Sequence, residues 1–455
     1  MKSNFPRLII AATQSGCGKT TITAGLLGVL KRRGLNVQPY KVGPDYIDTG
    51  WHALACGQPS HNLDSWLVGA DNLQKIFADT ARDADISVVE GVMGLYDGGR
   101  DGISSTAQIS KLLDAPVVLV VDAKSVGTSA AAVALGFREF DRTVKLAGVI
   151  LNRLGSASHE KMIVDALDKV GIKVFGALRR SDEFALPERH LGLVPTTENL
   201  AVDAMNKICA AVESQVDVDA LIALAESAVP IESFVRDEKI SPVAKIGVAR
   251  DAAFNFYYDA SLSLLERLGA RIEFFSPLDD ETLPAVDGLI IGGGFPEMFA
   301  SQLERNKKIR TEIFRAAADG LPIFAECGGF MYLMNRLVDF DGRAFEMCGV
   351  FDGCATMTRR LQRVGYVTAE IAKNCVVGQR GQTFHAHEFR YSVTDVEQNL
   401  FDCTRLRDES KFAAGVAVGN VAASYLHVHL TGCPTVAKNF VEACVRRRQQ
   451  ANTAR

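Results

Sequence analysis

No two cysteines in the sequence have the CxxC spacing of zinc and iron–sulfur sites, although 10 cysteines are present. They are scattered along the chain, and residues 1–6 lack the apolar segment of a secretory signal. This pattern favours reduced thiols over disulfides. We therefore expect a cytoplasmic protein without a cysteine-bound metal.

Long apolar runs and a basic surplus are absent as well. The longest apolar runs, residues 115–121 among them, have the length of a strand and are too short to span a bilayer. The formal net charge is −4, whereas nucleic-acid binding needs a basic surface. We expect neither a membrane protein nor a nucleic-acid-binding protein. With 47% hydrophobic residues and 455 residues in all, the chain should form a globular protein of two or three domains.

The first 225 residues alternate short apolar runs with helical patterns. The runs are almost continuously apolar, as expected for strands buried on both faces of a parallel sheet. They cover residues 7–12, 36–41, 86–90, 116–122, 145–151 and 172–178. Right-handed crossovers through the helices give a doubly wound α/β fold, in which ligands bind at the carboxyl ends of the strands.

A phosphate-binding loop follows the first run and leads into a helix predicted at 20–33. Backbone N–H groups at the start of this helix face an anion, Lys19 reaches the outer phosphates of a nucleotide, and the Thr20 hydroxyl can ligate Mg²⁺. Thr13 stands where the usual pattern has its first glycine, so we expect a variant loop. The predicted nucleotide-binding residues here are Ser15, Gly16, Cys17, Gly18, Lys19, Thr20 and Thr21.

Acidic residues follow the next two strands of this half. Asp45 and Asp48 come after residues 36–41, and Glu90 and Asp97 lie at and after the end of the following strand. Carboxylates beside bound phosphates suit Mg²⁺, which usually takes one or two of them together with water. Each residue could instead cap a helix or face solvent; Glu90 is our preferred metal candidate.

Two weaker signals complete this half. Asn152 follows the fifth strand, where nucleotide-binding folds often contact the base, and we assign it to nucleotide binding. Arg189 and His190 lie in a polar turn at 186–193. They can bind a carboxylate-bearing substrate or form a salt-bridged surface turn, and the residues alone leave both readings open.

Prolines and charges without a clear period mark residues 226–243 as a linker. A second α/β unit is expected over 244–447. Its predicted strands are 245–249, 271–275, 287–291 and 321–325, and its predicted helices are 258–268 and 298–319.

The second chemical signature is Cys327, which stands between a predicted strand and a helix. Two glycines follow it, as in a nucleophile elbow, and a helix N-terminus favours the thiolate. Gly293 and Gly294, which follow the neighbouring strand, are candidates with Gly328 for an oxyanion hole. The alternative is that Cys327 is a small core residue.

A cysteine nucleophile also needs a base, and His427 and His429 are the two candidates. Another histidine-rich stretch, His385-Ala-His387-Glu388, does not have the HExxH spacing of a metal helix. Its alternation fits a β-strand instead.

Taken together and in order, these segments resemble the cobyrinic acid a,c-diamide synthase family of the corrinoid (cobalamin) pathway. The resemblance implies an N-terminal P-loop domain similar to dethiobiotin synthetase, over residues 1–225, and a C-terminal class I glutamine amidotransferase domain. It also implies ATP-dependent amidation of the a and c carboxylates of cobyrinic acid, with glutamine as nitrogen donor and Mg²⁺ as cofactor. The matching stretches are 15–20, 41–48, 89–98, 188–193, 292–297, 325–329 and 424–427.

The resemblance also implies roles for single residues. Thr20, Asp45 and Glu90 would bind the metal. Cys327 would be the glutaminase nucleophile. His427 is preferred as its base because it ends the Ser-Tyr-x-His pattern. Residue 429 is histidine where many class I enzymes have glutamate, so a Cys–His dyad is expected. Substrate binding and activation would fall to Asp45, Tyr46, Asp48, Asp97, Arg189 and His190.

Several alternatives stay open. The substrate of the same reaction could be hydrogenobyrinic acid or Ni-sirohydrochlorin, and the related cobyric acid synthases have a similar chain arrangement. A P-loop partitioning or switch ATPase with a non-catalytic C-terminal domain is an alternative of another class. Thr13 and Gln14 argue against it, because such ATPases carry an additional lysine early in the loop. A homodimer is compatible with all of these readings.

Overall fold

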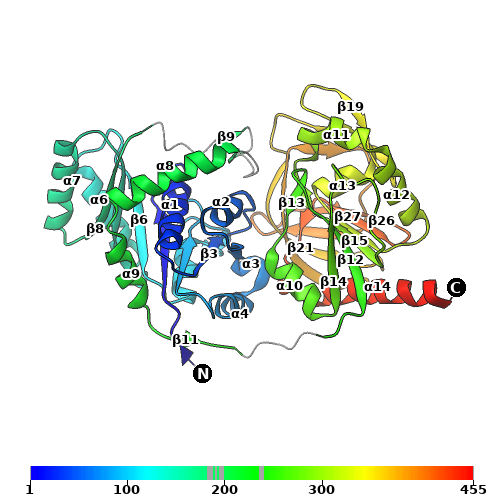
Figure 1. The fold of residues 1–455 in the computed structure, drawn as a ribbon, viewed down its shortest axis with the longest axis horizontal. Helices are drawn as coiled ribbons and strands as arrows, with labels where there is room; N and C mark the ends of the chain where they lie inside the picture. Colours follow the sequence, from blue (N-terminus) through cyan, green and yellow to red (C-terminus); the bar gives the residue numbers. More distant parts are fainter. Residues whose placement is uncertain (1, 182–187, 190–191, 194–198, 235–239, 454–455) are drawn as a thin grey trace. The chain divides into compact units, whose positions relative to one another are not determined.

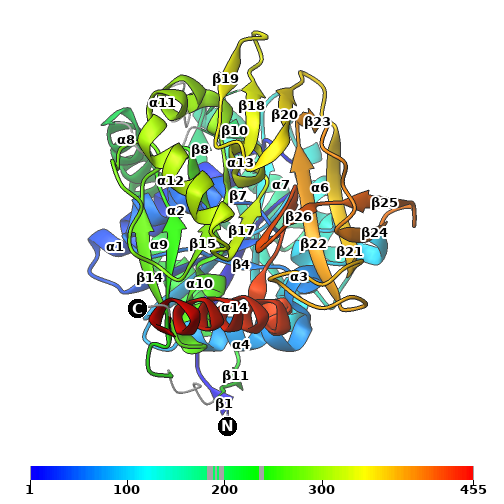
Figure 2. The ribbon, with the colours of Figure 1, turned by 90° about the vertical axis from the view of Figure 1, so that its right-hand side faces the viewer.

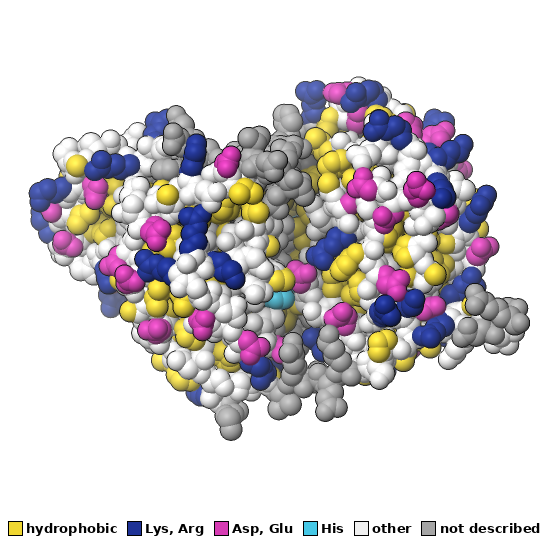
Figure 3. Space-filling model, in the orientation of Figure 1, with side chains coloured by type: hydrophobic (Ala, Val, Ile, Leu, Met, Phe, Trp, Pro, Cys, Tyr) yellow, Lys and Arg dark blue, Asp and Glu magenta, His cyan; other side chains and the backbone are white. Residues whose placement is uncertain are grey.

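The computed structural model describes residues 2–181, 188–189, 192–193, 199–234 and 240–453. The chain divides into two units, Met1–Arg236 and Asp237–Arg455, each of which carries its own sheet and core (Figure 1). No helix among the described residues is both long and apolar enough to cross a membrane. In Figure 3, basic and acidic side chains are interspersed over the visible face of each unit.

The N-terminal unit is built on a parallel sheet with strand order β4-β3-β5-β2-β6-β7-β8. The expected strands are confirmed to within a few residues at their ends. The additional strand β4 was not predicted, because it is only three residues long and two of them, His61 and Asn62, are polar. The strands are β2 (Arg7–Ala12), β3 (Val37–Val42), β4 (His61–Leu63), β5 (Ile86–Glu90), β6 (Val117–Asp122), β7 (Leu146–Leu154) and β8 (Val174–Arg179).

Helices cover both faces of this sheet. The first, α1 (Lys19–Arg32), packs against α2 (Ile47–Cys56) and α8 (Asn199–Gln215). Gly25 allows the close approach to α8, because a Cβ there would lie 2.6 Å from a methyl carbon of Val212. The other helices are α3 (Ser65–Val68), α4 (Ala70–Thr80), η1 (Arg100–Gly102), α5 (Thr106–Leu112), α6 (Ser129–Phe140), α7 (Ala157–Lys169) and α9 (Val218–Glu226).

Short strands lie outside the main sheet of this unit. Strand β9 (Glu188–Arg189) pairs with β10 (Gly192–Leu193). Strand β11 (Ile231–Glu232) lies inside the segment expected as a linker, yet it pairs with β1 (Lys2–Ser3). Part of that segment is therefore held against the N-terminal unit.

The C-terminal unit has a sheet with strand order β14-β12-β15-β17-β27-β26, parallel except for β26. The four predicted strands are confirmed, and Cys327 follows β17 at its carboxyl end. The bounds are β12 (Ala244–Ala249), β14 (Ala270–Phe275), β15 (Gly288–Ile291), β17 (Ile323–Glu326), β26 (Val416–Val418) and β27 (Val421–Ser424).

The prediction of one long helix at 298–319 is wrong. The chain forms η3 (Pro296–Phe299), α11 (Ala300–Arg305) and α12 (Lys307–Ala318), with a break at Asn306. Asn306 has φ −78° and ψ 61°, and its side-chain amide donates to the carbonyl oxygens of Pro277 and Asp280 at 3.0 and 2.9 Å. An asparagine that bonds to other backbone groups competes with helix continuation.

The C-terminal unit also has an antiparallel sheet with order β25-β24-β21-β22-β28, and its edge strand β28 carries the candidate base His427. Its strand β22 (Thr383–Arg390) confirms the strand expected for the histidine-rich stretch. Figure 2 shows α14 (Pro434–Thr453) beside α10 (Asp259–Arg267). The remaining elements are β13 (Phe254–Phe256), β16 (Gly293–Gly294), α13 (Gly328–Leu333), β18 (Met334–Val338), β19 (Ala344–Glu346), β20 (Phe351–Met357), β21 (Arg363–Ile371), β23 (Ser392–Thr394), β24 (Phe401–Arg405), β25 (Lys411–Ala414), β28 (Leu426–His427) and η4 (Leu430–Gly432).

Candidate active sites

The phosphate-binding loop joins β2 to α1, as expected. Gly18 stands at the helix start with φ 87°, a conformation that glycine adopts without strain. The carbonyl oxygen of Cys17 accepts a hydrogen bond from the side-chain amide of Asn152 at 2.8 Å. Burial lowers the pKa of Lys19 from its ordinary value, and the nearby positive charge of Lys41 lowers it further. Its ammonium therefore sits where added negative charge, such as a phosphate, is favoured.

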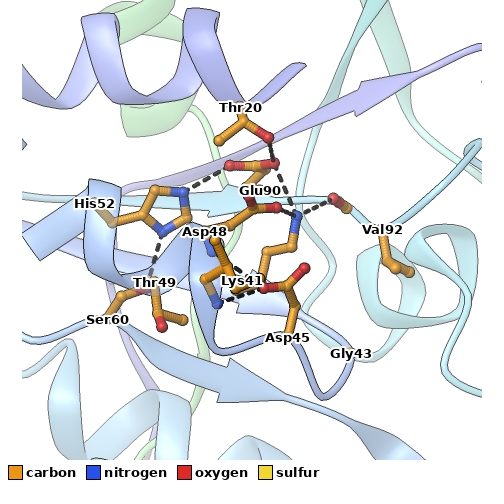
Figure 4. Close-up of polar contacts among 12 residues, drawn as sticks. Thr20, Lys41, Gly43, Asp45, Asp48, Thr49, His52, Ser60, Glu90 and Val92 are labelled. Carbon is orange, nitrogen blue, oxygen red and sulfur yellow. Dashed lines mark hydrogen bonds and ion pairs between the residues drawn. The ribbon is translucent and has the colours of Figure 1, made fainter. Parts of the chain in front are cut away.

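Glu90, at the carboxyl end of β5, is the centre of a buried polar cluster (Figure 4). Its Oε1 accepts hydrogen bonds from the Thr20 hydroxyl at 2.7 Å and from Lys41 Nζ at 2.8 Å. Its Oε2 lies 2.6 Å from Nε2 of His52. Lys41 also reaches Oδ2 of Asp48 at 2.5 Å. The predicted partners Thr20, Asp48 and Glu90 thus meet at one end of the sheet.

The charges in this cluster determine its protonation. Burial alone would raise the pKa of Glu90, but Lys41 and His52 outweigh it and hold that pKa well below its usual range. Burial would likewise lower the pKa of Lys41, yet Asp48 and Glu90 hold it above its ordinary value. Burial, followed by the charge of Asp45, raises the pKa of Asp48 to about 6. At neutral pH the cluster therefore contains an ionised Glu90 and a charged Lys41.

The oxygen atoms present fit Mg²⁺. The Thr20 hydroxyl and the Glu90 carboxylate are hard ligands that already lie within hydrogen-bond distance of each other beside the phosphate loop. Across the described ranges, no group of three or more His, Cys, Asp and Glu side chains is arranged to enclose a metal. Mg²⁺ does not need such a cage, because it keeps waters and binds substrate phosphates.

Other predicted residues of this unit have local structural partners. Oδ1 of Asp45 accepts hydrogen bonds from the backbone N–H groups of Ile47 and Asp48 at 2.7 and 3.0 Å and so caps the start of α2. Oδ2 of Asp97 accepts from the N–H of Gly94 at 3.0 Å within a turn. The helix-capping reading is therefore realised for Asp45, whereas Asp97 stabilises a turn, and the metal or substrate roles of both stay predictions.

Asn152, Tyr46, Arg189 and His190 stay predictions too. Asn152 supports the phosphate loop through its hydrogen bond to the carbonyl oxygen of Cys17. Tyr46 is half-buried just before α2. Arg189 is described only as part of β9, without its side chain, and His190 lies outside the described residues.

In the C-terminal unit Cys327 occupies the predicted elbow between β17 and α13. Its φ of 46° and ψ of −101° are unusual for a residue with a side chain, and such strain is concentrated at functional sites. Its N–H donates to the carbonyl oxygen of Ser424 at 2.7 Å, which ties the elbow to β27. The thiol lies 3.9 Å from the carbonyl oxygen of Phe389, at the end of β22.

The three predicted oxyanion glycines lie close to the nucleophile and the base. The N–H of Gly294 lies 3.1 Å from the position that a Cβ on Gly328 would take. A Cβ on Gly293 would lie 2.6 Å from Cε1 of His427. The imidazole of His427 therefore excludes a Cβ at 293, and a Cβ at 328 would crowd Cδ of Pro296 at 2.9 Å.

The structure separates the two candidate bases. His427 is buried and lies against the glycine loop. His429, two residues on, stacks on Tyr258 with ring centroids 4.4 Å apart, and its Nδ1 lies 2.8 Å from Oγ1 of Thr431. His429 is thus engaged with its own neighbours, which favours His427 as the base.

The electrostatics of Cys327 differ from the expectation. Burial raises the pKa of the thiol to about 12, and the charges of Glu297 and Glu388 act in the same direction. Burial also lowers the pKa of His427 to about 3. The backbone N–H of Gly328 at the helix end does act toward the thiolate, as expected, but burial outweighs it, so the expected thiolate is not the favoured form of Cys327. Thiol and imidazole are both neutral here.

Sequence reasoning missed several members of these sites. Lys41 is the penultimate residue of β3, and its position near a strand carboxyl end was a usable signal. His52 and Ser60 gave no signal in the sequence. Only the fold brings His52, on a helix, to Glu90, and Ser60, on a loop, to His52. Arg390 and Glu388 of β22, paired at 2.7 Å, flank the segment whose carbonyl contacts Cys327.

Comparison with known proteins matches both units. Residues 8–194 match the family model described as the CobQ/CobB/MinD/ParA nucleotide binding domain. Residues 245–434 match the CobB/CobQ-like glutamine amidotransferase domain.

Curated relatives match nearly the whole chain. A cobyrinate a,c-diamide synthase of Salmonella typhimurium is 42% identical over 98% of this chain and 100% of its own length. One from Dehalococcoides mccartyi is 40% identical over 96% and 98%. A hydrogenobyrinate a,c-diamide synthase of Streptomyces coelicolor is 42% identical over 97% and 98%. The expected resemblance is confirmed, and the chain belongs to the family of cobyrinate and hydrogenobyrinate a,c-diamide synthases.

Proposed function

We propose that this protein amidates the a and c carboxylates of cobyrinate or hydrogenobyrinate, with ATP consumed and glutamine as the nitrogen donor. The relatives named above support the substrate class. The observation that carries the proposal is the backbone of Cys327, which presents the thiol at a strained elbow beside a glycine loop and His427. A glutaminase site in one unit and a phosphate loop in the other are the two parts that such a synthase needs.

In the N-terminal unit, a carboxylate oxygen of the substrate attacks the γ-phosphorus of ATP. ADP leaves, and an acyl phosphate forms. Lys19 neutralises charge on the phosphates, and the loop N–H groups hold them. When bound, Mg²⁺ supplies further charge neutralisation, and Thr20 and Glu90 are the residues that would hold it. Ammonia then attacks the acyl carbon, the amide forms and phosphate leaves.

In the C-terminal unit, the sulfur of Cys327 attacks the side-chain amide of glutamine. The proton of the thiol passes to His427, which delivers it to the departing ammonia. N–H groups of Gly294 and Gly328 are the candidate donors to the oxyanion. His427 then takes a proton from water, whose oxygen attacks the thioester carbon. Glutamate is released, and His427 returns the proton to the departing sulfur of Cys327. Because both groups start neutral, substrate binding must favour the proton transfer.

The test is an amidation assay followed by mass spectrometry, with ATP and amide-¹⁵N glutamine. Cobyrinic acid, hydrogenobyrinic acid and Ni-sirohydrochlorin are offered separately. We expect two labelled amides on one of the first two, and none when ATP is omitted. Amidation of Ni-sirohydrochlorin alone would move the protein to another substrate, and ATP turnover without any amide product would refute the synthase assignment.

A further inference from the structure

We infer that His52 is a positioning residue that fixes the carboxylate of Glu90 for magnesium-bound ATP. The inference rests on the proposed function, because it takes Glu90 as a metal-binding residue. His52 belongs to no motif that pointed to chemistry. It reaches Glu90 only because α2 packs against α1 and against β3, the strand that pairs with β5.

The contacts of His52 are short and sealed from water. Nε2 lies 2.6 Å from Oε2 of Glu90, and neither side chain has any exposed surface. On the other side of the ring, Nδ1 lies 2.9 Å from the hydroxyl of Ser60, which is also buried. Figure 4 shows the imidazole between these two partners.

The chemistry of the partners determines which nitrogen donates. An ionised carboxylate only accepts hydrogen bonds, so Nε2 of His52 must carry a hydrogen toward Glu90. A neutral ring accepts from the Ser60 hydroxyl at Nδ1 and a protonated ring donates to it, so the contact with Ser60 holds in either form. Because a hydroxyl can donate as well as accept, Ser60 does not select the form of the ring, but its hydrogen bond fixes the orientation of the ring toward Glu90. A chain of this kind, in which an outer group orients an inner ligand, is common around metal sites.

The two oxygens of Glu90 are thus divided between two tasks. Oε2 is held by His52, whereas Oε1 is shared by Thr20 and Lys41 on the side of the phosphate loop. With Oε2 fixed, the carboxylate cannot rotate about its last bond without losing a buried hydrogen bond. Oε1 is therefore kept beside the Thr20 hydroxyl. Without His52, a buried acceptor is left unpaired and this orientation is lost.

Three variants separate positioning from general stability. His52→Leu removes both contacts, His52→Gln keeps an N–H at the distance of Nε2, and Ser60→Ala removes only the outer contact. Isothermal titration calorimetry of the full-length protein with a non-hydrolysable ATP analogue, with and without Mg²⁺, gives the gain in affinity due to the metal. Binding without Mg²⁺ reports whether the phosphate loop is intact.

We expect His52→Leu to reduce the magnesium-dependent gain about tenfold or more, with metal-free binding unchanged, as for other outer-contact residues of metal sites. The magnesium-dependent gain of His52→Gln should stay within about threefold of the wild-type gain. The gain of Ser60→Ala should fall between those of His52→Leu and His52→Gln. A His52→Leu variant with the full magnesium-dependent gain would overturn the inference, as would loss of metal-free binding in His52→Gln and His52→Leu alike.

Glu90→Gln distinguishes this inference from the proposed function. If Glu90→Gln lowers the magnesium-dependent gain and His52→Leu does not, Glu90 binds the metal without help from His52 and only the inference fails. If Glu90→Gln leaves the gain unchanged, the metal role of Glu90 fails and the inference fails with it.

Discussion

Lys41 Nζ and Glu90 Oε1 are 2.8 Å apart, and this ion pair is closed off from solvent, with 3% and 0% of the two side chains exposed. Each charge depends on the other, because an ion buried without a partner loses its hydration and gains nothing in return. The same ammonium also pairs with Asp48. Lys41 is therefore the cation that allows two carboxylates to be buried beside the phosphate loop.

Lys41→Met should destabilise the N-terminal unit by about 3–5 kcal/mol, because it leaves buried carboxylates without their cation. Hydrogen exchange of peptides from β3 and β5 measures the change, and peptides from the C-terminal unit serve as the internal control. The double variant Lys41→Met, Glu90→Gln should recover part of the loss. If Lys41→Met alone shows the same hydrogen exchange in β3 and β5 as the wild-type protein, the ion pair is not needed for stability.

Cys327→Ser should abolish amidation with glutamine and preserve amidation with an ammonium salt. The serine hydroxyl is a far weaker nucleophile than the thiol, whereas the phosphate-loop unit does not use Cys327. Product formation with each nitrogen source is measured by mass spectrometry. Loss of both activities in a folded variant would contradict two separable sites.

His427→Ala should reduce glutaminase turnover by about 10²–10⁴-fold, as expected when a general base is removed. His429→Ala should leave most of the glutaminase turnover, because the ring of His429 stacks on Tyr258 and bonds to Thr431. Glutamate release from glutamine measures both variants. If His429→Ala loses more glutaminase turnover than His427→Ala and keeps the thermal stability of the wild-type protein, the assignment of His427 as the base is wrong.

The stability of the C-terminal unit should fall as the pH rises toward 8. Burial raises the pKa of Glu326 to about 8, although its Oε1 accepts a hydrogen bond from the N–H of Val428 at 3.1 Å. In the unfolded chain a glutamate ionises near pH 4.3, so the folded state binds an extra proton between these values. This contribution is complete below about pH 4 and is lost as the pH approaches 8.

Thermal unfolding followed between pH 5 and pH 8.5 tests the effect. The unchanged protein should lose roughly 2–4 kcal/mol over this range, and Glu326→Gln should lose less, because it has no proton to release. Burial raises the pKa of Glu297 to about 7, so some slope should persist in the variant. Equal slopes in both proteins would contradict a protonated Glu326.

The sequence determined the parts of this protein that depend on local pattern. Continuous apolar runs identified β2 and β5 at their observed bounds, because strands buried on both faces have no polar side to interrupt them. The glycine-lysine-threonine loop identified the phosphate site, and the glycines after Cys327 identified the elbow. Strand ends also placed Glu90 correctly, because all parallel strands deliver their carboxyl ends to the same edge.

Tertiary structure decided what depends on residues far apart in the chain. His52 meets Glu90 across 38 positions, and Phe389 meets Cys327 across 62. Asn306 interrupts a helix that its periodicity predicted, because its side chain finds carbonyl partners on another segment. The neighbours of His427 and His429 also differ only through the fold, and His427 stays the predicted base. Burial, which raises the pKa of Cys327 above that of an ordinary thiol, is a property of the packed fold and has no signal in the sequence.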